Sequence, residues 1–406
     1  MMKLNRWIYA AVGVIMLLSA GLVYAWSVLS LPLGAYFTDW SKAQLSLTFT
    51  ICMMSFCIGC MAGGMMSGKL KVRFHVWISG GLFFAGFLLA SRAASPGMLY
   101  LGYGGFCGFA SGFVYNAVLS AMSAWFPDKQ GLISGILLMG FGISSFIVGK
   151  VYQAVTPSGE GIEAWRNSFF GFGVILAVVF AMCGFFFAKP SKEDLKAQNV
   201  VIPEKKKTKG EGLDLDARQM VSRPSFWLFF LWTITVGGAG MALISQASGI
   251  AKEVGPAVEA GRIATVVGLI SIFNGLGRVF FGNLFDRKGR KVTMAMVGIC
   301  FSFSSVILVG AVALQAFSLV VAGFICCGFS YGGLNPSISA YVNYSYGARH
   351  YPVNFSVMNL NLLAASFGGT IAGILFDASG SYMTTLLYMA ASGAVSLMFA
   401  MGIRKI

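Results

Sequence analysis

Long apolar stretches recur from one end of the chain to the other, and each is long enough to cross a lipid bilayer as a helix. Such a crossing needs about 20 mainly apolar residues, and by this measure we predict twelve spanning helices. Charged residues make up only 11% of the 406 residues, whereas soluble domains carry roughly a quarter. The sequence therefore predicts an all-α integral membrane protein. The predicted spans are 8–33, 44–66, 74–94, 97–123, 132–154, 167–188, 225–250, 260–284, 292–313, 316–341, 354–376 and 382–403.

The net charge of +15 would also suit a protein that binds nucleic acid. The basic residues, however, lie in short loops between apolar spans, where they determine topology, so we expect no nucleic-acid partner. With both termini and the loop 189–223 on one side of the bilayer, most of the 29 Lys and Arg residues lie on that side. The positive-inside rule then places both termini in the cytoplasm.

One hydrophilic stretch, 189–223, interrupts the series of apolar spans. It is rich in Lys and Arg, contains two prolines and has few large apolar residues. This composition is typical of a partly disordered linker. We therefore predict a six-helix half at 1–188, a cytoplasmic linker at 189–223 and a second six-helix half at 224–406.

The eight cysteines all fall within predicted spans, so we expect no disulfide, no metal site and no cofactor. Cys57-x-x-Cys60 has the spacing of a redox pair, but no His or further Cys accompanies it, and burial as packing residues is the simpler reading. An enzyme within the membrane would need a deep cluster of acids, His or Cys, which the sequence lacks. A sensor that binds without carrying would need a signalling domain, and the only long loop is a charged linker.

Arg278 is the one charged residue that we cannot assign to a membrane end or a loop. A guanidinium at that depth costs a few kcal/mol, so it needs a polar cavity, a partner or a function. Asn274 lies one helical turn away on the same face. Because a guanidinium holds a carboxylate through two parallel hydrogen bonds, the pair is a candidate organic-anion site. The alternative is that Arg278 extends along the helix to the cytoplasmic surface.

The loop between the eighth and ninth spans carries a recognisable motif. It reads Gly282-Asn283-Leu284-Phe285-Asp286-Arg287-Lys288-Gly289-Arg290-Lys291, and Gly282, Asp286, Arg287, Gly289 and Arg290 are its key positions. The matching loop of the first half, 64–73, has Gly68 where the acid would stand. The motif resembles that of the major facilitator superfamily, which implies two pseudo-symmetric six-helix halves and alternating access. We expect the carboxylate to cap a neighbouring helix or pair with a basic residue across the half interface, mainly on the second-half side.

Three further segments narrow the resemblance. They are Trp125-Phe126-Pro127-Asp128-Lys129-Gln130-Gly131-Leu132, Arg223-Pro224-Ser225-Phe226-Trp227 and Ala348-Arg349-His350-Tyr351. Together with Asn274-x-x-Gly277-Arg278 they are similar to the oxalate/formate antiporter family and its relatives, the monocarboxylate (lactate/pyruvate) transporters. The resemblance implies a bacterial-type transporter of the prokaryotic inner membrane, working as a monomer.

The remaining substrate contacts should come from polar side chains deep in other spans. In this superfamily the substrate lies between the halves near the bilayer midplane. Each candidate taken alone is more often a helix-packing residue than a ligand, and Tyr331 gains support from the neighbouring Gly332-Gly333. The candidates are Tyr115, Asn116, Tyr331, Tyr24, Tyr388, Asn359 and Asn361.

Departures from the two families favour one carboxylate as the cargo. The oxalate antiporter has a lysine in the eleventh helix, but the matching positions here are Met358 or Asn361. One fixed positive charge suits a monocarboxylate such as lactate or pyruvate. Animal monocarboxylate transporters place an Asp one turn before the arginine, where this chain has Asn274, so proton symport is implied by resemblance without an evident proton acceptor. The alternative is organic-anion exchange of the oxalate/formate type.

Overall fold

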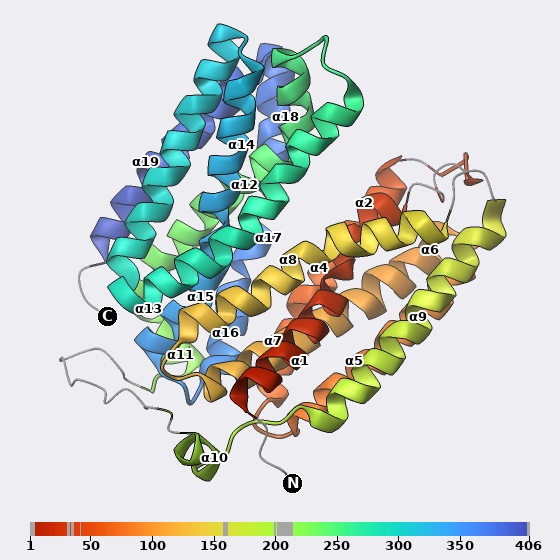
Figure 1. Cartoon of the computed structure of the whole chain (residues 1–406), viewed down its shortest axis with the longest axis vertical. Coiled ribbons are helices and arrows are strands. Elements are labelled where there is room, and N and C mark those ends of the chain that lie inside the picture. Colours follow the sequence, from red (N-terminus) through yellow and green to blue (C-terminus); the bar gives the residue numbers. More distant parts are fainter. Residues whose placement is uncertain are drawn as a thin grey trace. The chain divides into compact units, whose positions relative to one another are not determined.

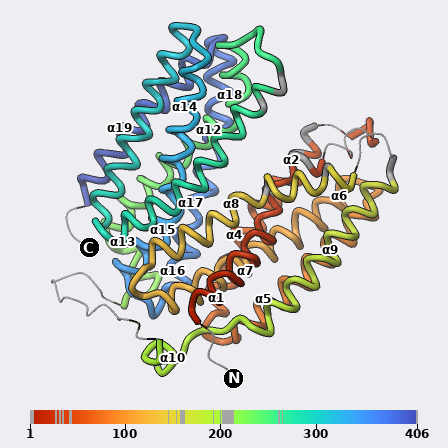
Figure 2. Tube along the Cα trace, viewed as in Figure 1, coloured from red at the N-terminus to blue at the C-terminus, as the bar shows by residue number. Residues whose placement is uncertain are grey.

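The computed structural model describes residues 5–30, 33, 36–40, 42–156, 161–198, 200 and 214–403. These described residues are helical and contain no strand, as Figures 1 and 2 show. Eleven helical segments among them are long and apolar enough to cross a membrane. This arrangement confirms the all-α membrane fold.

The longest segment, α13 (Ala260–Leu314), accounts for the difference between eleven segments and the twelve predicted spans. Gly289 within it has φ 74° and ψ −179°, a backbone conformation that is essentially restricted to glycine. No atom lies within 4 Å of the position that a Cβ would take there. The glycine of the loop motif therefore serves the turn that divides α13 into two helices, at the place where the sequence predicts a loop.

The chain forms two compact units. The first comprises 1–127, 140–202 and 351–359, and the second comprises 128–139, 203–350 and 360–406. These units differ from the predicted halves at two segments. The first turns of α8 pack with the second unit, and α16 packs with the first.

The first unit contains the earlier helices of the chain and one later segment. Its first predicted span is divided among α1, the 3₁₀ turn η1 and α2, and its fourth span includes the π-helical segment η2. Its helices are α1 (Arg6–Ala20), η1 (Gly21–Ala25), α2 (Trp26–Leu29), α4 (Lys42–Met66), α5 (Val72–Ser91), α6 (Pro96–Leu99), η2 (Tyr100–Cys107), α7 (Gly108–Trp125), most of α8 (Gln130–Val155), α9 (Gly161–Phe186), α10 (Lys192–Ala197) and α16 (Tyr351–Asn359).

The second unit contains the later helices. Two of its predicted spans are interrupted: the tenth at Gly333, and the eleventh at Leu360 and Ser366. Its helices are the first turns of α8, α11 (Ala217–Val221), α12 (Pro224–Val254), α13, α14 (Phe317–Gly332), α15 (Leu334–Tyr346), α17 (Asn361–Ala365), α18 (Phe367–Ser379) and α19 (Met383–Gly402).

The same close helix crossing occurs in both units. In the first, α7 lies so near α4 that a Cβ on Gly112 would stand 1.9 Å from the carbonyl oxygen of Phe56. In the second, α14 lies so near α13 that a Cβ on Gly332 would stand 2.3 Å from that of Asn274. Only glycine allows helix backbones to approach this closely. The internal repeat seen in the loops thus extends into the spanning helices.

The predicted linker is more ordered at its ends than its composition suggests. Ser191 and Asp194 form a capping box at the start of α10, and Asp216 and Gln219 form another at the start of α11. Capping of this kind stabilises short helices in water. The central part of the predicted linker, 201–213, lies outside the described residues.

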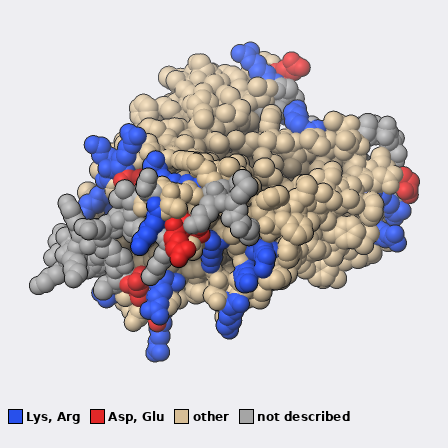
Figure 3. Space-filling view, turned by 60° about the horizontal axis from the view of Figure 1, so that its bottom comes forward, with Lys and Arg blue, Asp and Glu red and all other residues tan. Residues whose placement is uncertain are grey.

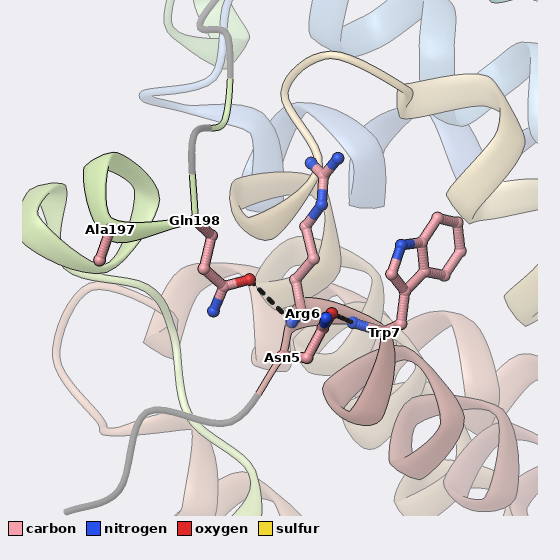
Figure 4. A pocket seen from close by; sticks show the side chains of 5 residues that line it. All are labelled: Asn5, Arg6, Trp7, Ala197 and Gln198. Atoms are coloured by element: carbon pink, nitrogen blue, oxygen red, sulfur yellow. Dashed lines mark hydrogen bonds between the residues drawn. The ribbon is translucent and has the colours of Figure 1, made fainter.

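The start of α1 and the end of α10 enclose a surface pocket of about 540 Å³, drawn in Figure 4. The side-chain oxygen of Gln198 accepts a hydrogen bond from the backbone N–H of Arg6 at 2.9 Å. The Arg6 guanidinium points away from Gln198 and lies 4.6 Å from the ring centre of Phe126. None of the predicted substrate residues lines this pocket, which is formed by Asn5, Arg6, Trp7, Ala197 and Gln198.

The surface of the protein suits a lipid environment. Large apolar side chains are widely exposed, among them Phe185 at 68%, Leu314 at 73% and Met401 at 71%. Figure 3 shows broad areas without any charged side chain. Extended exposed apolar surface of this kind is stable against acyl chains and unfavourable in water.

Candidate anion site on helix α13

Arg278 is buried, with 8% of its surface exposed. Its Nε donates a hydrogen bond to the side-chain oxygen of Asn274 at 2.9 Å, and its Nη1 donates to the backbone carbonyl of Leu138 on α8. Both acceptors are neutral amide oxygens, so the guanidinium keeps its positive charge among them. The side chain turns toward Asn274 and away from the loop at Gly289. This geometry differs from a side chain extended to the cytoplasmic surface.

The glycine crossing brings Tyr331 to the level of the Asn274–Arg278 turn. A Cβ on Gly332 would lie 2.9 Å from the backbone nitrogen of Arg278, so α14 meets α13 at the site turn itself. Tyr331 precedes that glycine and is 8% exposed. Its ring packs over Gly240 of α12, where a Cβ would stand 2.2 Å from Cδ2. Three predicted site residues are therefore grouped on α13 and α14.

Two other candidates of the second unit lie against α12. Asn361 is 1% exposed, and its side-chain oxygen has no hydrogen-bond partner among the described residues. The hydroxyl of Tyr388 is 3.6 Å from the position that a Cβ on Gly238 would take. A buried amide oxygen without a donor is costly, which keeps Asn361 among the candidates for a polar ligand.

Asn116, in the first unit, uses its amide to hold helices together. It is fully buried, and its Nδ2 donates to the carbonyl of Pro352 and to Oγ of Ser356, both at 2.9 Å. Its oxygen accepts from Ser120 at 3.1 Å. The Ser356 hydroxyl in turn donates to the carbonyl of Cys60 at 2.8 Å. In this structure Asn116 joins α7 to α16, and its hydrogen-bonding groups are engaged by the protein.

The other candidates of the first unit are two tyrosines packed against aromatic rings and an asparagine that donates a hydrogen bond to its own helix backbone. Tyr115 is 4% exposed, and its ring centre lies 5.1 Å from that of Phe141 and 5.8 Å from that of Phe355. Tyr24 packs edge-on to Phe141 at 5.4 Å. Asn359 donates from Nδ2 to the carbonyl of Phe355, one turn earlier, at 2.7 Å. The structure thus packs the two tyrosines among aromatic rings and bonds the Asn359 amide to its own helix.

The repeat gives Arg278 a counterpart in the first unit, which the sequence analysis missed. A Cβ on Gly112 would lie 2.8 Å from the backbone nitrogen of Cys60, as one on Gly332 would lie 2.9 Å from that of Arg278. The counterpart of the arginine is therefore a neutral, buried thiol. Glycines spaced four apart in both helices, with Gly108 and Gly328 preceding, were the sequence signal that could have revealed this correspondence.

Asp286 of the loop motif caps the start of α8. Its two carboxylate oxygens accept hydrogen bonds from the backbone N–H groups of Gly131 and Leu132, each at 2.8 Å, and Tyr344 donates to it at 3.3 Å. A carboxylate at a helix N-terminus satisfies unpaired donors and the helix dipole together. Of the other motif residues, Gly282 packs on Gly131, Arg287 is exposed and Arg290 is partly buried.

The structure gives a physical reason why the first-half loop has Gly68 where the second-half loop has Asp286. A Cβ on Gly64 would lie 2.5 Å from the carbonyl of Pro352, just as one on Gly282 would lie 2.1 Å from that of Gly131. Pro352 therefore stands where Gly131 stands in the other crossing. Because proline has no backbone N–H, an acid in place of Gly68 would lack the donor that Gly131 offers to Asp286.

The eight cysteines all lie among the described residues. All eight cysteines are free thiols. The described residues contain no group of three or more His, Cys, Asp or Glu side chains that could hold a metal ion.

Comparison with known proteins supports this reading of the fold. A model described as "Major Facilitator Superfamily" matches residues 8–370. The oxalate:formate antiporter of Oxalobacter formigenes is 26% identical over 382 residues, which cover 91% of this chain and 85% of that protein. Monocarboxylate transporter 12 of Mus musculus is 27% identical over 143 residues, covering 35% of this chain and 28% of that protein.

A solved structure resembles the whole chain. The crystal structure of the transporter FucP in the outward conformation aligns with a TM-score of 0.73, covering 99% of this chain and 100% of that one. Sequence identity is 16%, so the likeness concerns the fold.

The cap on α8 can be tested by a graded pair of substitutions. Asp286→Ala removes both acceptor oxygens and should lower stability by about 1–2 kcal/mol, as loss of a helix cap does. Asp286→Asn keeps one acceptor oxygen, so its stability should lie between that of Asp286→Ala and that of the wild type. Thermal unfolding of the detergent-purified proteins gives the order. Equal melting temperatures for all three proteins would contradict the capping role.

Proposed function

The chain belongs to the major facilitator superfamily, and from that premise we propose that it carries a small monocarboxylate of the lactate or pyruvate type across the membrane by alternating access. It is a membrane transporter of this superfamily. The observation that carries the finer proposal is the buried guanidinium of Arg278, held by the neutral oxygens of Asn274 and Leu138.

A carboxylate is the ligand that this arrangement fits. A guanidinium binds a carboxylate through two parallel hydrogen bonds in which both partners are charged, whereas an amide oxygen is a neutral acceptor. A substrate carboxylate can therefore compete with the amide oxygens of Asn274 and Leu138 for the guanidinium. Tyr331, beside the site turn, offers a hydroxyl donor to a second substrate oxygen.

The distribution of charge favours a single carboxylate. The counterpart of Arg278 in the repeat is Cys60, and the place of the lysine in oxalate antiporters falls at Met358 or Asn361. A dicarboxylate such as oxalate would bring a second negative charge to neutral groups, which is unfavourable in a buried site. Tyr115, Asn116, Tyr24, Tyr388, Asn359 and Asn361 remain second-line candidates for contacts to the rest of the substrate.

A second candidate function is exchange of organic anions of the oxalate/formate type. The similarity to the oxalate:formate antiporter over 91% of the chain favours it. Asn274 also favours exchange, because an amide cannot carry a proton on its own. Proton symport is implied by the resemblance of the sequence motifs to the monocarboxylate transporter family, one member of which matches 35% of this chain. We propose symport as the first reading and exchange as the second.

We further infer the organisation that this function requires. The halves 1–188 and 224–406 would alternate about a central site, with 189–223 and both termini in the cytoplasm of a prokaryotic cell and the monomer as the working unit. The excess of Lys and Arg in the loops on that side supports this orientation.

The central test is uptake of labelled lactate and pyruvate into proteoliposomes. Arg278→Ala should abolish uptake because the variant has lost the only group that we assign to bind the carboxylate. Arg262→Ala is the matched control, since it removes an exposed arginine from the same helix, and it should retain uptake. Uptake by folded Arg278→Ala at the wild-type rate would overturn the site.

Imposed gradients separate the two coupling schemes. Proton symport predicts that a pH gradient, with the outside more acidic than the inside, drives accumulation into empty proteoliposomes. Exchange predicts uptake only into vesicles preloaded with a carboxylate such as formate, with little response to pH. Uptake that requires preloading and ignores the pH gradient would exclude symport.

A further inference from the structure

Three contacts fix the first turns of α8 on α13. Asp286 caps the helix at Gly131 and Leu132. A Cβ on Gly131 would lie 2.1 Å from the carbonyl oxygen of Gly282. One turn later, a Cβ on Gly135 would lie 2.4 Å from the carbonyl oxygen of Arg278 itself. Backbone therefore meets backbone at the residue that we assign to bind substrate.

The close approach at Gly135 has a direct consequence for the guanidinium. Leu138 follows Gly135 by three residues, nearly one helical turn, and so lies on the same side of α8. Its carbonyl accepts the hydrogen bond from Nη1 of Arg278. A side chain at position 135 would push the two helices apart and carry this acceptor away from the arginine.

The equivalent crossing in the first unit accommodates a residue larger than glycine at the position that corresponds to Gly135. In the first unit, Pro352 and Ser356 of α16 meet Gly64 and Cys60 of α4 at the same spacing of four residues. Ser356 stands where Gly135 stands, and its hydroxyl donates to the carbonyl of Cys60 at 2.8 Å. Where the facing residue is a thiol, the position carries a side chain. Where it is the arginine, the position is glycine.

We propose that Gly135 is a positioning residue for Arg278. By letting α8 approach, it places the Leu138 carbonyl where it turns the guanidinium toward Asn274 and holds it ready for a carboxylate. This inference rests on the proposed role of Arg278 in substrate binding, and it adds a backbone acceptor that the incoming carboxylate must displace or share.

Displacement at this point links the substrate to the packing of α8. A carboxylate that takes the Nη1 donor from Leu138 removes one of the contacts between α8 and α13. The other contacts remain, namely the backbone approach at Gly135, the one between Gly131 and Gly282, and the cap by Asp286. Because the guanidinium carries five N–H donors, a carboxylate can share Nη1 with Leu138 or displace it. Where it displaces the carbonyl, substrate binding and this contact between α8 and α13 weaken each other.

Transport kinetics test the proposal. Gly135→Ser introduces the residue of the other repeat, and Gly135→Ala introduces the smallest side chain. Both should raise the KM for lactate about tenfold, the effect of misplacing one charge-assisted hydrogen bond. Gly112→Ala is the packing control, because it crowds a different helix crossing, that of α7 with α4 near Cys60, at least as tightly. It should lower the yield of folded protein and leave the KM of that folded protein within twofold.

A second readout does not depend on transport. Phenylglyoxal modifies arginines, and mass spectrometry reports the rate at Arg278. In the wild type this rate should be well below that of the exposed Arg262, and Gly135→Ser should raise it severalfold while Gly112→Ala leaves it unchanged. The wild-type comparison decides the matter even if the Gly135 variants do not fold, because a rate equal to that of Arg262 would refute the hold by Leu138.

The outcomes distinguish the proposed substrate-binding role of Arg278 from the positioning role of Gly135. Lactate uptake that survives Arg278→Ala overturns the proposed function, and the modification rates then still judge the role of Gly135. Loss of uptake in Arg278→Ala, with KM and modification rate unchanged in both Gly135 variants, overturns the positioning role alone.

Discussion

A charged guanidinium within an apolar helix is the constraint on which the second unit is built. Placing an arginine in the centre of a spanning helix costs about 2.5–3.5 kcal/mol on insertion scales. The protein meets this cost by surrounding Arg278 with backbone and amide oxygens rather than with a carboxylate on the same turn. Gly135 on α8 lets one of those oxygens, the carbonyl oxygen of Leu138, approach. The helix packing and the candidate site are therefore the same set of contacts.

The two repeats use one crossing for two purposes. In the first unit, Asn116 and Ser356 join α7, α4 and α16 through neutral hydrogen bonds around Cys60. In the second, Asp286 and Gly135 join α8 to α13 around Arg278. Both charged side chains of this crossing, the site arginine Arg278 and the capping acid Asp286, belong to the second unit. This asymmetry gives the proposed transporter one anion anchor instead of two.

Much of the fold was accessible from the sequence, because apolar length and loop charge are properties of the chain itself. The spans, the loop motif and Arg278 with Asn274 all followed from residue type and spacing. The partner of Arg278 on α8 did not, since a backbone carbonyl is present at every residue and carries no signature. The packing role of Asn116 was also inaccessible, because its acceptors lie more than two hundred positions away. The exchange of α16 and the start of α8 between units depends on tertiary packing that no local pattern encodes.

The most direct test of the central claim is the thermal stability of purified protein with lactate or with oxalate. A ligand that binds only the folded state stabilises it by RT ln(1 + [L]/Kd) and so raises the melting temperature. The account predicts that lactate raises the melting temperature of the wild type by several degrees, that oxalate does so less, and that neither affects Arg278→Ala. A larger shift with oxalate, or an equal lactate shift in Arg278→Ala, would contradict a single-cation site for one carboxylate.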